Sequence, residues 1–133
     1  MRRLRADQRG AVALYAAVIM LALMATIGLV LDGGRKVAAL REATNIADNA
    51  ARAGAQRIDL DSARSGGPVR LDAAAAAAAA ADYLSLVGRA GVTAVNGDTI
   101  TVTVSIAYDT VILPTATRTV TATESAAARV VEG

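Results

Sequence analysis

The sequence predicts an α+β protein. An N-terminal transmembrane helix continues into an Ala-rich helix, followed by a second Ala-rich helix and a small antiparallel sheet of about three strands. Three observations predict this class. An uncharged apolar run lies near the start of the 133-residue chain, and Ala then recurs at helical spacing. In the last third the pattern changes to alternation of β-branched and hydroxyl residues, which is typical of strands.

The apolar run extends from Ala11 to Leu31 and contains no charged residue. At about 1.5 Å per residue it is roughly 30 Å long as a helix, which matches the hydrocarbon core of a bilayer. A cleaved secretory signal and a buried soluble helix are the alternatives. Signal peptides have apolar regions of about 7 to 15 residues ending at an Ala-x-Ala-like site, for which Leu23-Met24-Ala25 is a poor substitute. We therefore expect a membrane anchor over residues 11–31.

Basic residues on the two sides of the run predict its orientation. Four Arg lie in the first nine residues, whereas only Arg35 and Lys36 follow the run closely. Because Lys and Arg are retained on the cytoplasmic side, residues 1–10 are expected to form a cytoplasmic tail and the C-terminal part to lie outside. The expected arrangement is therefore a single pass with the N-terminus inside. The residues expected to set this topology are Arg2, Arg3, Arg5 and Arg9.

Residues 32–58 are predicted to form an extracytoplasmic helical stalk. Small residues repeat every four positions there and give one smooth face, which permits close contact with another helix. Ala that merely favours helix formation in a solvated stalk is the alternative. Gly33-Gly34 either breaks the join to the membrane helix or is tolerated in a packed helix, and the sequence leaves this open. The expected helix-packing residues are Ala13, Ala17, Ala43, Ala47, Ala51 and Gly54.

A polar segment at 59–71, with Ser, Gly-Gly and Pro, is predicted to be a linker. The remaining residues, 72–133, are expected to form a small α+β domain. Asp72 is placed to cap a helix that begins with the unbroken Ala73–Ala81 tract, and Gly88 and Gly91 are placed to end it.

The strand pattern begins after this helix. Val92–Val95 and Thr99–Tyr108 are predicted to form a hairpin around a tight turn at Asn96-Gly97-Asp98. The apolar face of the hairpin needs a cover, and the Ala-rich helix just before it is the expected one. Pro114 is expected to interrupt pairing, and Thr117–Val131 to form a third strand antiparallel to the second.

The amino-acid composition argues against enzymatic catalysis. The chain has no His and no Cys, so the commonest general base and metal ligands are missing, and its Ser residues lack a partner base. We expect no enzymatic activity, no cofactor and no metal site. A net charge of +2 does not favour nucleic-acid binding. The absence of Phe and Trp and the excess of Ala predict a weak independent core, which favours assembly with other subunits.

Three short motifs together resemble the N-terminal region of TadE/TadG-like proteins, pilin-like components of the tight-adherence (Flp, type IVb) pilus machinery. They are Arg9-Gly10-Ala11-Val12-Ala13 at the start of the membrane helix, Leu31-Asp32-Gly33-Gly34-Arg35 at its end, and Ala43-Thr44-Asn45-Ile46-Ala47-Asp48-Asn49-Ala50-Ala51-Arg52-Ala53-Gly54-Ala55 after it. The resemblance covers roughly the first 57 residues.

The resemblance implies a pilin-like fold and a single-pass protein of the bacterial inner membrane. Such a protein packs with other pilin-like subunits, as a homo- or hetero-oligomer, in a pilus or a related secretion system. Some members are cleaved after a Gly that is followed by Glu and Tyr at the fifth and sixth positions. Here Gly10 and Ala11 mark the corresponding site, but Tyr15 stands fifth and Glu is absent, so an uncleaved, TadG-like anchor fits better. The alternative function is a secreted or membrane-anchored binding module of the cell envelope without a pilus role.

Overall fold

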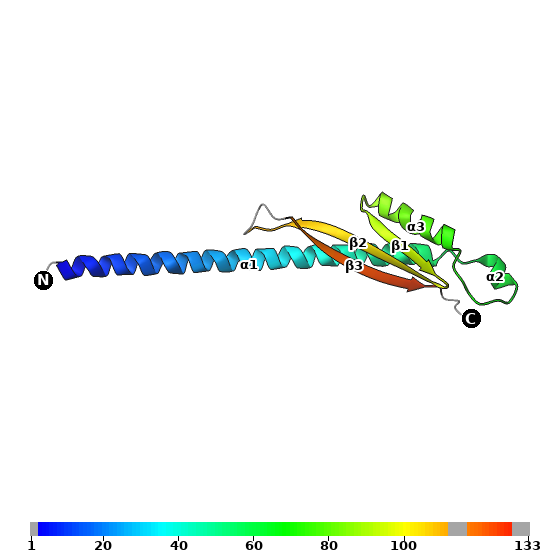
Figure 1. Ribbon diagram of the computed structural model, residues 1–133, viewed down its shortest axis with the longest axis horizontal. Coiled ribbons are helices and arrows are strands. Elements are labelled where there is room, and N and C mark those ends of the chain that lie inside the picture. The colour runs from blue at the N-terminus through cyan, green and yellow to red at the C-terminus, as the bar shows by residue number, and fades with distance from the viewer. Residues whose placement is uncertain (1–2, 112–116, 129–133) are drawn as a thin grey trace.

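The computed structural model describes residues 3–111 and 117–128, with side chains from residue 10 onward. Figure 1 shows a long helix, α1, whose N-terminal half projects away from the rest of the chain and whose C-terminal half lies along a small sheet. This is the α+β architecture that the sequence predicts. The predicted topology residue Arg2, the expected interruption at Pro114 and the expected strand end at Val131 lie outside the described residues.

Helix α1 (Arg3–Ala55) runs without a break through the double glycine. Its 53 residues correspond to about 80 Å at 1.5 Å per residue. A Cβ at Gly33 or at Gly34 would meet no atom within 4 Å, so no close neighbour requires glycine at either position. The helix therefore carries two helix-weakening residues where packing does not explain them.

The predicted linker contains a short helix, α2 (Leu60–Arg64), which the sequence analysis did not predict. The Asp59 side chain caps it by accepting hydrogen bonds from the backbone N–H groups of Asp61, at 3.1 Å, and Ser62, at 3.2 Å. A single β-bridge between Ile58 and Leu71 closes the base of the segment. The linker is thus a closed loop that returns the chain to the end of α1.

Helix α3 (Ala73–Leu86) forms as the sequence predicts. Its cap is Asp72, whose Oδ1 accepts a hydrogen bond from the backbone N–H of Ala75 at 3.0 Å. Gly88 has a φ of +66°, and this left-handed conformation ends the helix at little steric cost. Local chemistry at both ends therefore fixes the length of α3.

The sheet has three antiparallel strands in the order β1 (Gly91–Asn96), β2 (Thr99–Asp109) and β3 (Thr117–Ala127). A two-residue turn joins β1 to β2, with Gly97 at a φ of +65°. Glycine at the first turn position provides the positive φ that a tight hairpin needs. The hairpin and the third strand confirm the predicted sheet.

One face of the sheet is covered by two helices. Helix α1 packs on β2 and β3, whereas α3 packs beside α1 and against β1. Helix α3 covers the β1 side of the hairpin, as expected, but α1 supplies most of the cover over β2 and β3. Helix α1 does so because its Ala-lined face allows close approach to the sheet. The fully buried residues are Ala43, Ala47, Ala50, Ala51, Ala76, Ala80, Ile100, Val102 and Val104.

Candidate membrane anchor and assembly surfaces

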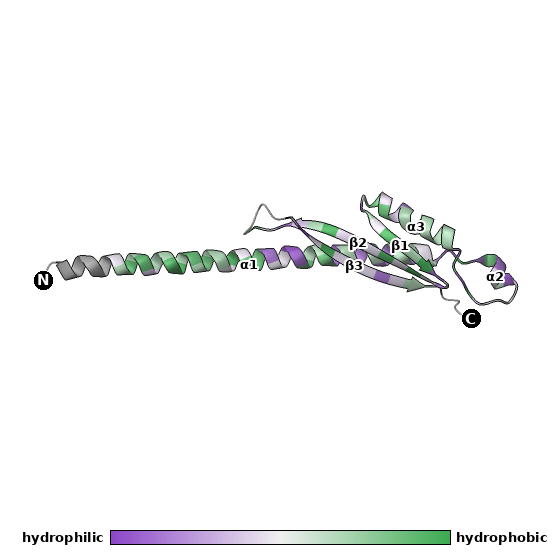
Figure 2. Cartoon of the chain, viewed as in Figure 1, coloured by the Kyte–Doolittle hydropathy of each residue, from purple (hydrophilic) through white to green (hydrophobic). Residues whose placement is uncertain are grey.

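The described side chains in the N-terminal half of α1, which begin at residue 10, present an apolar surface on all sides. Figure 2 shows hydrophobic residues along this half, followed by a polar band where the sheet begins to cover the helix. The helix is long and apolar enough to cross a membrane, and only 6% of its most apolar window is buried within the chain. This is consistent with a single-pass membrane protein. Large apolar side chains exposed along this half include Val12, Leu14, Tyr15, Val18, Ile19, Met20, Leu21, Leu23, Met24, Ile27, Leu29, Val30 and Leu31.

The predicted helix-packing residues fall into two groups. Ala13 and Ala17 lie in the exposed apolar half of α1 and contact no other element of the chain. By contrast, Ala43, Ala47 and Ala51 are fully buried in the core that α1 forms with α3 and the sheet of the same molecule. These three residues and Gly54, which lies against Ala76 of α3, build the core of the chain, so only Ala13 and Ala17 are left exposed for contact with a helix of another subunit.

The N-terminal residues expected to set topology and processing belong to α1. Arg3, Arg5 and Arg9 lie in its first two turns, and Gly10 and Ala11 continue it without interruption. A Cβ at Gly10 would meet nothing within 4 Å. Orientation across the membrane and cleavage after Gly10 stay predictions.

The end of β2 is fastened to α1 just beyond the apolar run. The backbone N–H of Val111 donates a hydrogen bond to Oδ1 of Asp32, and Nη1 of Arg35 donates one to the carbonyl oxygen of Asp109 at 3.3 Å. Both contacts flank the double glycine. They hold the sheet and the helix together at the point where the helix leaves the apolar segment.

A cavity of about 270 Å³ opens beside these contacts, and we call it the junction cavity. Lys36 on α1, Arg118 on β3 and Tyr108 on β2 all line it. In the sequence Tyr108 and Arg118 are more than seventy positions from Lys36, and no local signal groups them. The described lining is Leu29, Asp32, Gly33, Lys36, Tyr108, Thr110 and Arg118.

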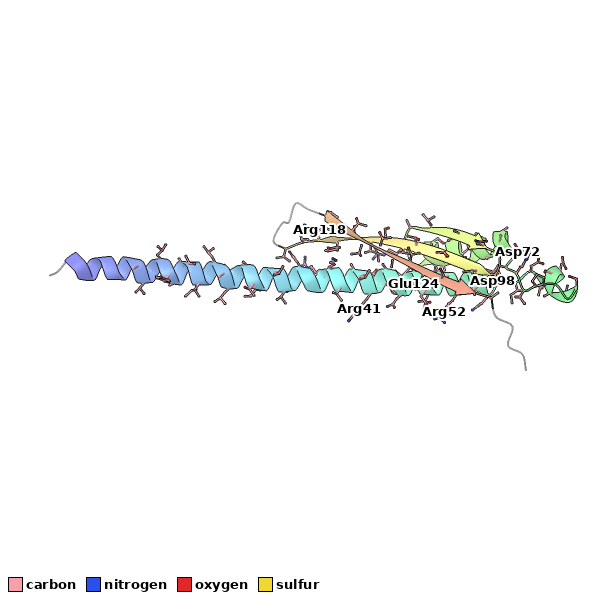
Figure 3. All side chains as sticks on the ribbon, turned by 60° about the horizontal axis from the view of Figure 1, so that its bottom comes forward. Arg41, Arg52, Asp72, Asp98, Arg118 and Glu124 are labelled. Carbon is pink, nitrogen blue, oxygen red and sulfur yellow. The ribbon has the colours of Figure 1, made fainter. Side chains whose placement is uncertain are left out.

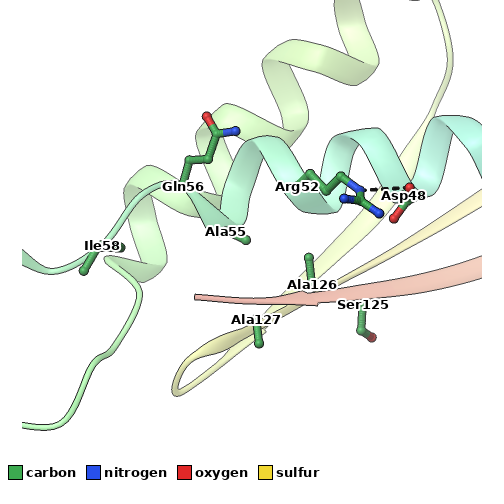
Figure 4. A pocket seen from close by; sticks show the side chains of 8 residues that line it. All are labelled: Asp48, Arg52, Ala55, Gln56, Ile58, Ser125, Ala126 and Ala127. Carbon is green, nitrogen blue, oxygen red and sulfur yellow. Dashed lines mark hydrogen bonds and ion pairs between the residues drawn. The ribbon is translucent and has the colours of Figure 1, made fainter. Parts of the chain in front are cut away.

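A larger groove, of about 670 Å³, lies at the other end of the domain between α1 and the end of β3. Figure 4 shows Ala55 and Ala126 on its walls and Arg52 turned toward Asp48, to which its Nε is bound at 3.0 Å. This ion pair is exposed and contributes little to stability. Because the arginine is already paired, the groove presents no unengaged charge from this pair to a ligand.

The face of the sheet away from the helices carries hydroxyl groups. Opposed side chains of β2 and β3 form three hydrogen bonds: Thr101 with Ser125 at 2.8 Å, Thr103 with Thr123 at 3.0 Å and Ser105 with Thr121 at 3.0 Å. These cross-strand pairs stabilise the sheet and give it a polar outer face. The hydroxyls bond to one another in pairs, which explains the Thr and Ser half of the alternating pattern.

Strand β3 forms one edge of the sheet and carries two charges on its helix-facing side. Arg118 and Glu124 alternate there with Val120 and Ala122, and Figure 3 shows Arg118 at the end of the sheet nearer the exposed half of α1. Charges that point inward on an edge strand oppose edge-to-edge pairing with other sheets. The strand is thus protected against uncontrolled association.

No reactive constellation is evident within residues 10–111 and 117–128. No group of three or more acidic residues in this part of the chain could hold a metal ion.

Comparison with known proteins agrees with the resemblance drawn from the motifs. Residues 10–57 match the model of the family described as putative Flp pilus-assembly TadE/G-like. The matched segment comprises most of α1 and ends before α2, so it includes the apolar half and the helix face that packs on the sheet. No curated protein and no solved structure matches the chain. The match supports a role related to Flp pilus assembly.

Proposed function

We propose that the chain is a minor pilin-like, TadE/TadG-like component of a Flp pilus or a related secretion system. It is anchored in the inner membrane by the N-terminal half of α1, with its α+β domain outside the cytoplasm. Its action is structural: the membrane half of α1 packs against helices of other subunits, and the folded domain docks on them.

The observation that carries this proposal is the division of α1. Between residues 11 and 31 the helix exposes apolar side chains, and its C-terminal half is the main cover of the sheet. Since the helix is unbroken, a force or displacement at the membrane is transmitted directly to the folded domain. An anchor joined through a flexible linker would not couple the two parts in this way.

Lateral packing in the bilayer is assigned to the face of Ala13 and Ala17. Small residues four positions apart allow two helix backbones to approach closely. Lipid tails are as apolar as the helices, so the hydrophobic effect does not drive helix association in a bilayer, and close van der Waals packing does so instead. Tyr15 lies about 200° around the helix from Ala13 and so marks the opposite face. Substitutions on the two faces can therefore be compared in the same membrane segment.

The test is complementation in the organism that carries the chain. After deletion, wild-type protein is expected to restore surface pili, counted by electron microscopy. Ala17→Ile is expected to restore clearly fewer pili at an equal amount of membrane-bound protein. The matched control, Tyr15→Leu, is expected to restore the wild-type number.

An unchanged pilus count after deletion would exclude the pilus role and favour the binding-module alternative. Intact mass measurement of the protein in the membrane and in the medium then separates the two forms of that alternative. A chain that starts beyond Leu31 and is found in the medium would overturn the anchor itself. A chain that starts at Ala11 in the membrane would establish cleavage after Gly10.

A further inference from the structure

We propose that the junction cavity is a docking site for the headgroups of anionic phospholipids in the membrane that anchors the chain. This inference rests on the proposed function only in requiring that α1 crosses a membrane. It assigns a partner to the residues that close the domain onto the helix, namely Lys36, Tyr108 and Arg118.

The position of the cavity along α1 places it near the membrane surface. Its lining begins at Leu29, inside the apolar run, and reaches Lys36, which is about 10 Å further along the helix at 1.5 Å per residue. The polar headgroup layer on each side of a bilayer is roughly 5 to 8 Å thick. When the apolar run lies in the hydrocarbon core, the cavity therefore opens at the depth of the headgroups.

The cavity is lined by basic side chains that can bind an anionic headgroup. Lys36 and Arg118 are both exposed, and within the described residues neither has a hydrogen bond or an ion pair. The carboxylate that also lines the cavity, Asp32, is occupied by the backbone N–H of Val111. Two cations thus face the cavity beside one engaged carboxylate, and this arrangement is complementary to a lipid phosphate.

Aromatic and apolar residues at the cavity are suited to a membrane interface. Tyr108 is half-buried on the helix-facing side of β2, with an apolar ring beside the phenol group that can donate a hydrogen bond. Tyr is enriched at membrane interfaces for this reason. Val111, which is 41% exposed, follows the end of β2 and donates its backbone hydrogen bond to Asp32 of the same cavity. The end of the sheet thus presents apolar, aromatic and cationic groups to the interface.

Docking here has a mechanical consequence. The cations come from two distant parts of the chain, so a headgroup bound between Lys36 and Arg118 joins α1 to the edge strand in addition to the contacts of Asp32 and Arg35. The domain is then held against the membrane surface.

The test is native mass spectrometry of the full chain from micelles that contain equal amounts of phosphatidylglycerol and phosphatidylcholine. Wild type is expected to retain phosphatidylglycerol preferentially. A basic residue near a membrane surface contributes a factor of about five, so the doubly substituted chain, Lys36→Gln with Arg118→Gln, is expected to lose roughly tenfold to thirtyfold of the preference. Both side chains are exposed, and circular dichroism verifies that the variant keeps its fold.

The control is Arg41→Gln with Arg57→Gln, which removes the same charge from exposed positions further along the chain. This control is expected to keep the wild-type preference. Equal retention of the two lipids by wild type, or equal loss in both double variants, would overturn the docking site. Alkaline extraction of membranes that contain the full chain distinguishes the two proposals: release of the chain refutes the anchor, whereas firm integration without lipid preference refutes only the headgroup site.

Discussion

The backbone of Gly54 on α1 lies directly against the backbone of Ala76 on α3. A Cβ on Gly54 would stand 2.9 Å from the carbonyl oxygen of Ala76 and would overlap the Ile100 side chain on β2. Glycine at this position therefore sets how closely the two helices and the sheet approach one another. The same absence of a side chain has no such role at Gly34, where a Cβ would meet nothing.

Substitution Gly54→Ala is expected to lower the free energy of unfolding by about 1 to 3 kcal/mol, because the added methyl group overpacks the contact between α1 and α3. The measurement is denaturant unfolding of the full chain in detergent micelles, followed by circular dichroism. Gly34→Ala is the control and is expected to raise helix stability by about 1 kcal/mol. Similar effects of the two substitutions would contradict the close helix crossing.

Introduction of a charge at Val102 tests the buried face of β2. Val102 is fully buried, so Val102→Asp is expected to cost roughly 3 kcal/mol or more and to reduce the amount of folded protein. Thr119→Asp places the same group on the exposed face of β3 and is expected to cost less than about 1 kcal/mol. Limited proteolysis of both variants in membranes provides the comparison, and equal protease resistance would show that the Val102 face is open to solvent.

The two groups of Ala in α1 are expected to respond differently to Leu. Ala47→Leu adds volume to a fully buried site and is expected to destabilise the domain by about 1 to 3 kcal/mol. Ala17→Leu changes only the exposed apolar half and is expected to leave domain stability unchanged. Thermal unfolding of both variants in the same micelles measures this difference. A stable Ala47→Leu variant would mean that α1 does not lie on the sheet.

Loss of the α3 cap is expected to have a moderate effect. Asp72→Ala removes the acceptor of the Ala75 backbone N–H and is expected to cost about 1 kcal/mol. Asp82→Ala, an exposed site within the same helix, is expected to be neutral or slightly stabilising because Ala favours helix. Hydrogen exchange at the first turn of α3 reports the cap directly. Unchanged exchange in the Asp72 variant would argue against the capping bond.

Local signals in the sequence were sufficient to predict most of the helices and strands. The uncharged run from Ala11 to Leu31 specified a helix of membrane length, and Asp72 with Gly88 specified both ends of α3. Alternation around Gly97 specified the hairpin. In each case the determining residues are neighbours in the chain, so their pattern is readable without knowledge of the fold.

The sequence pattern alone did not show what each surface contacts. The spacing of Ala43, Ala47 and Ala51 predicted a smooth face for close packing but could not say whether it would contact another subunit or the chain's own sheet. A row of small residues allows close packing against either of them. The short α2 was missed because its cap at Asp59 lies within a segment whose Gly and Pro signal a loop.

The sequence by itself determined an apolar anchor, two Ala-rich helices and an alternating sheet, because each depends on periodicity along a continuous segment. Only the tertiary structure decided that α1 covers β2 and β3 and that Lys36 and Arg118 line one cavity. Those relationships depend on contacts between residues far apart in the chain. Such contacts form when the sheet folds back along the helix, and local propensity does not encode them.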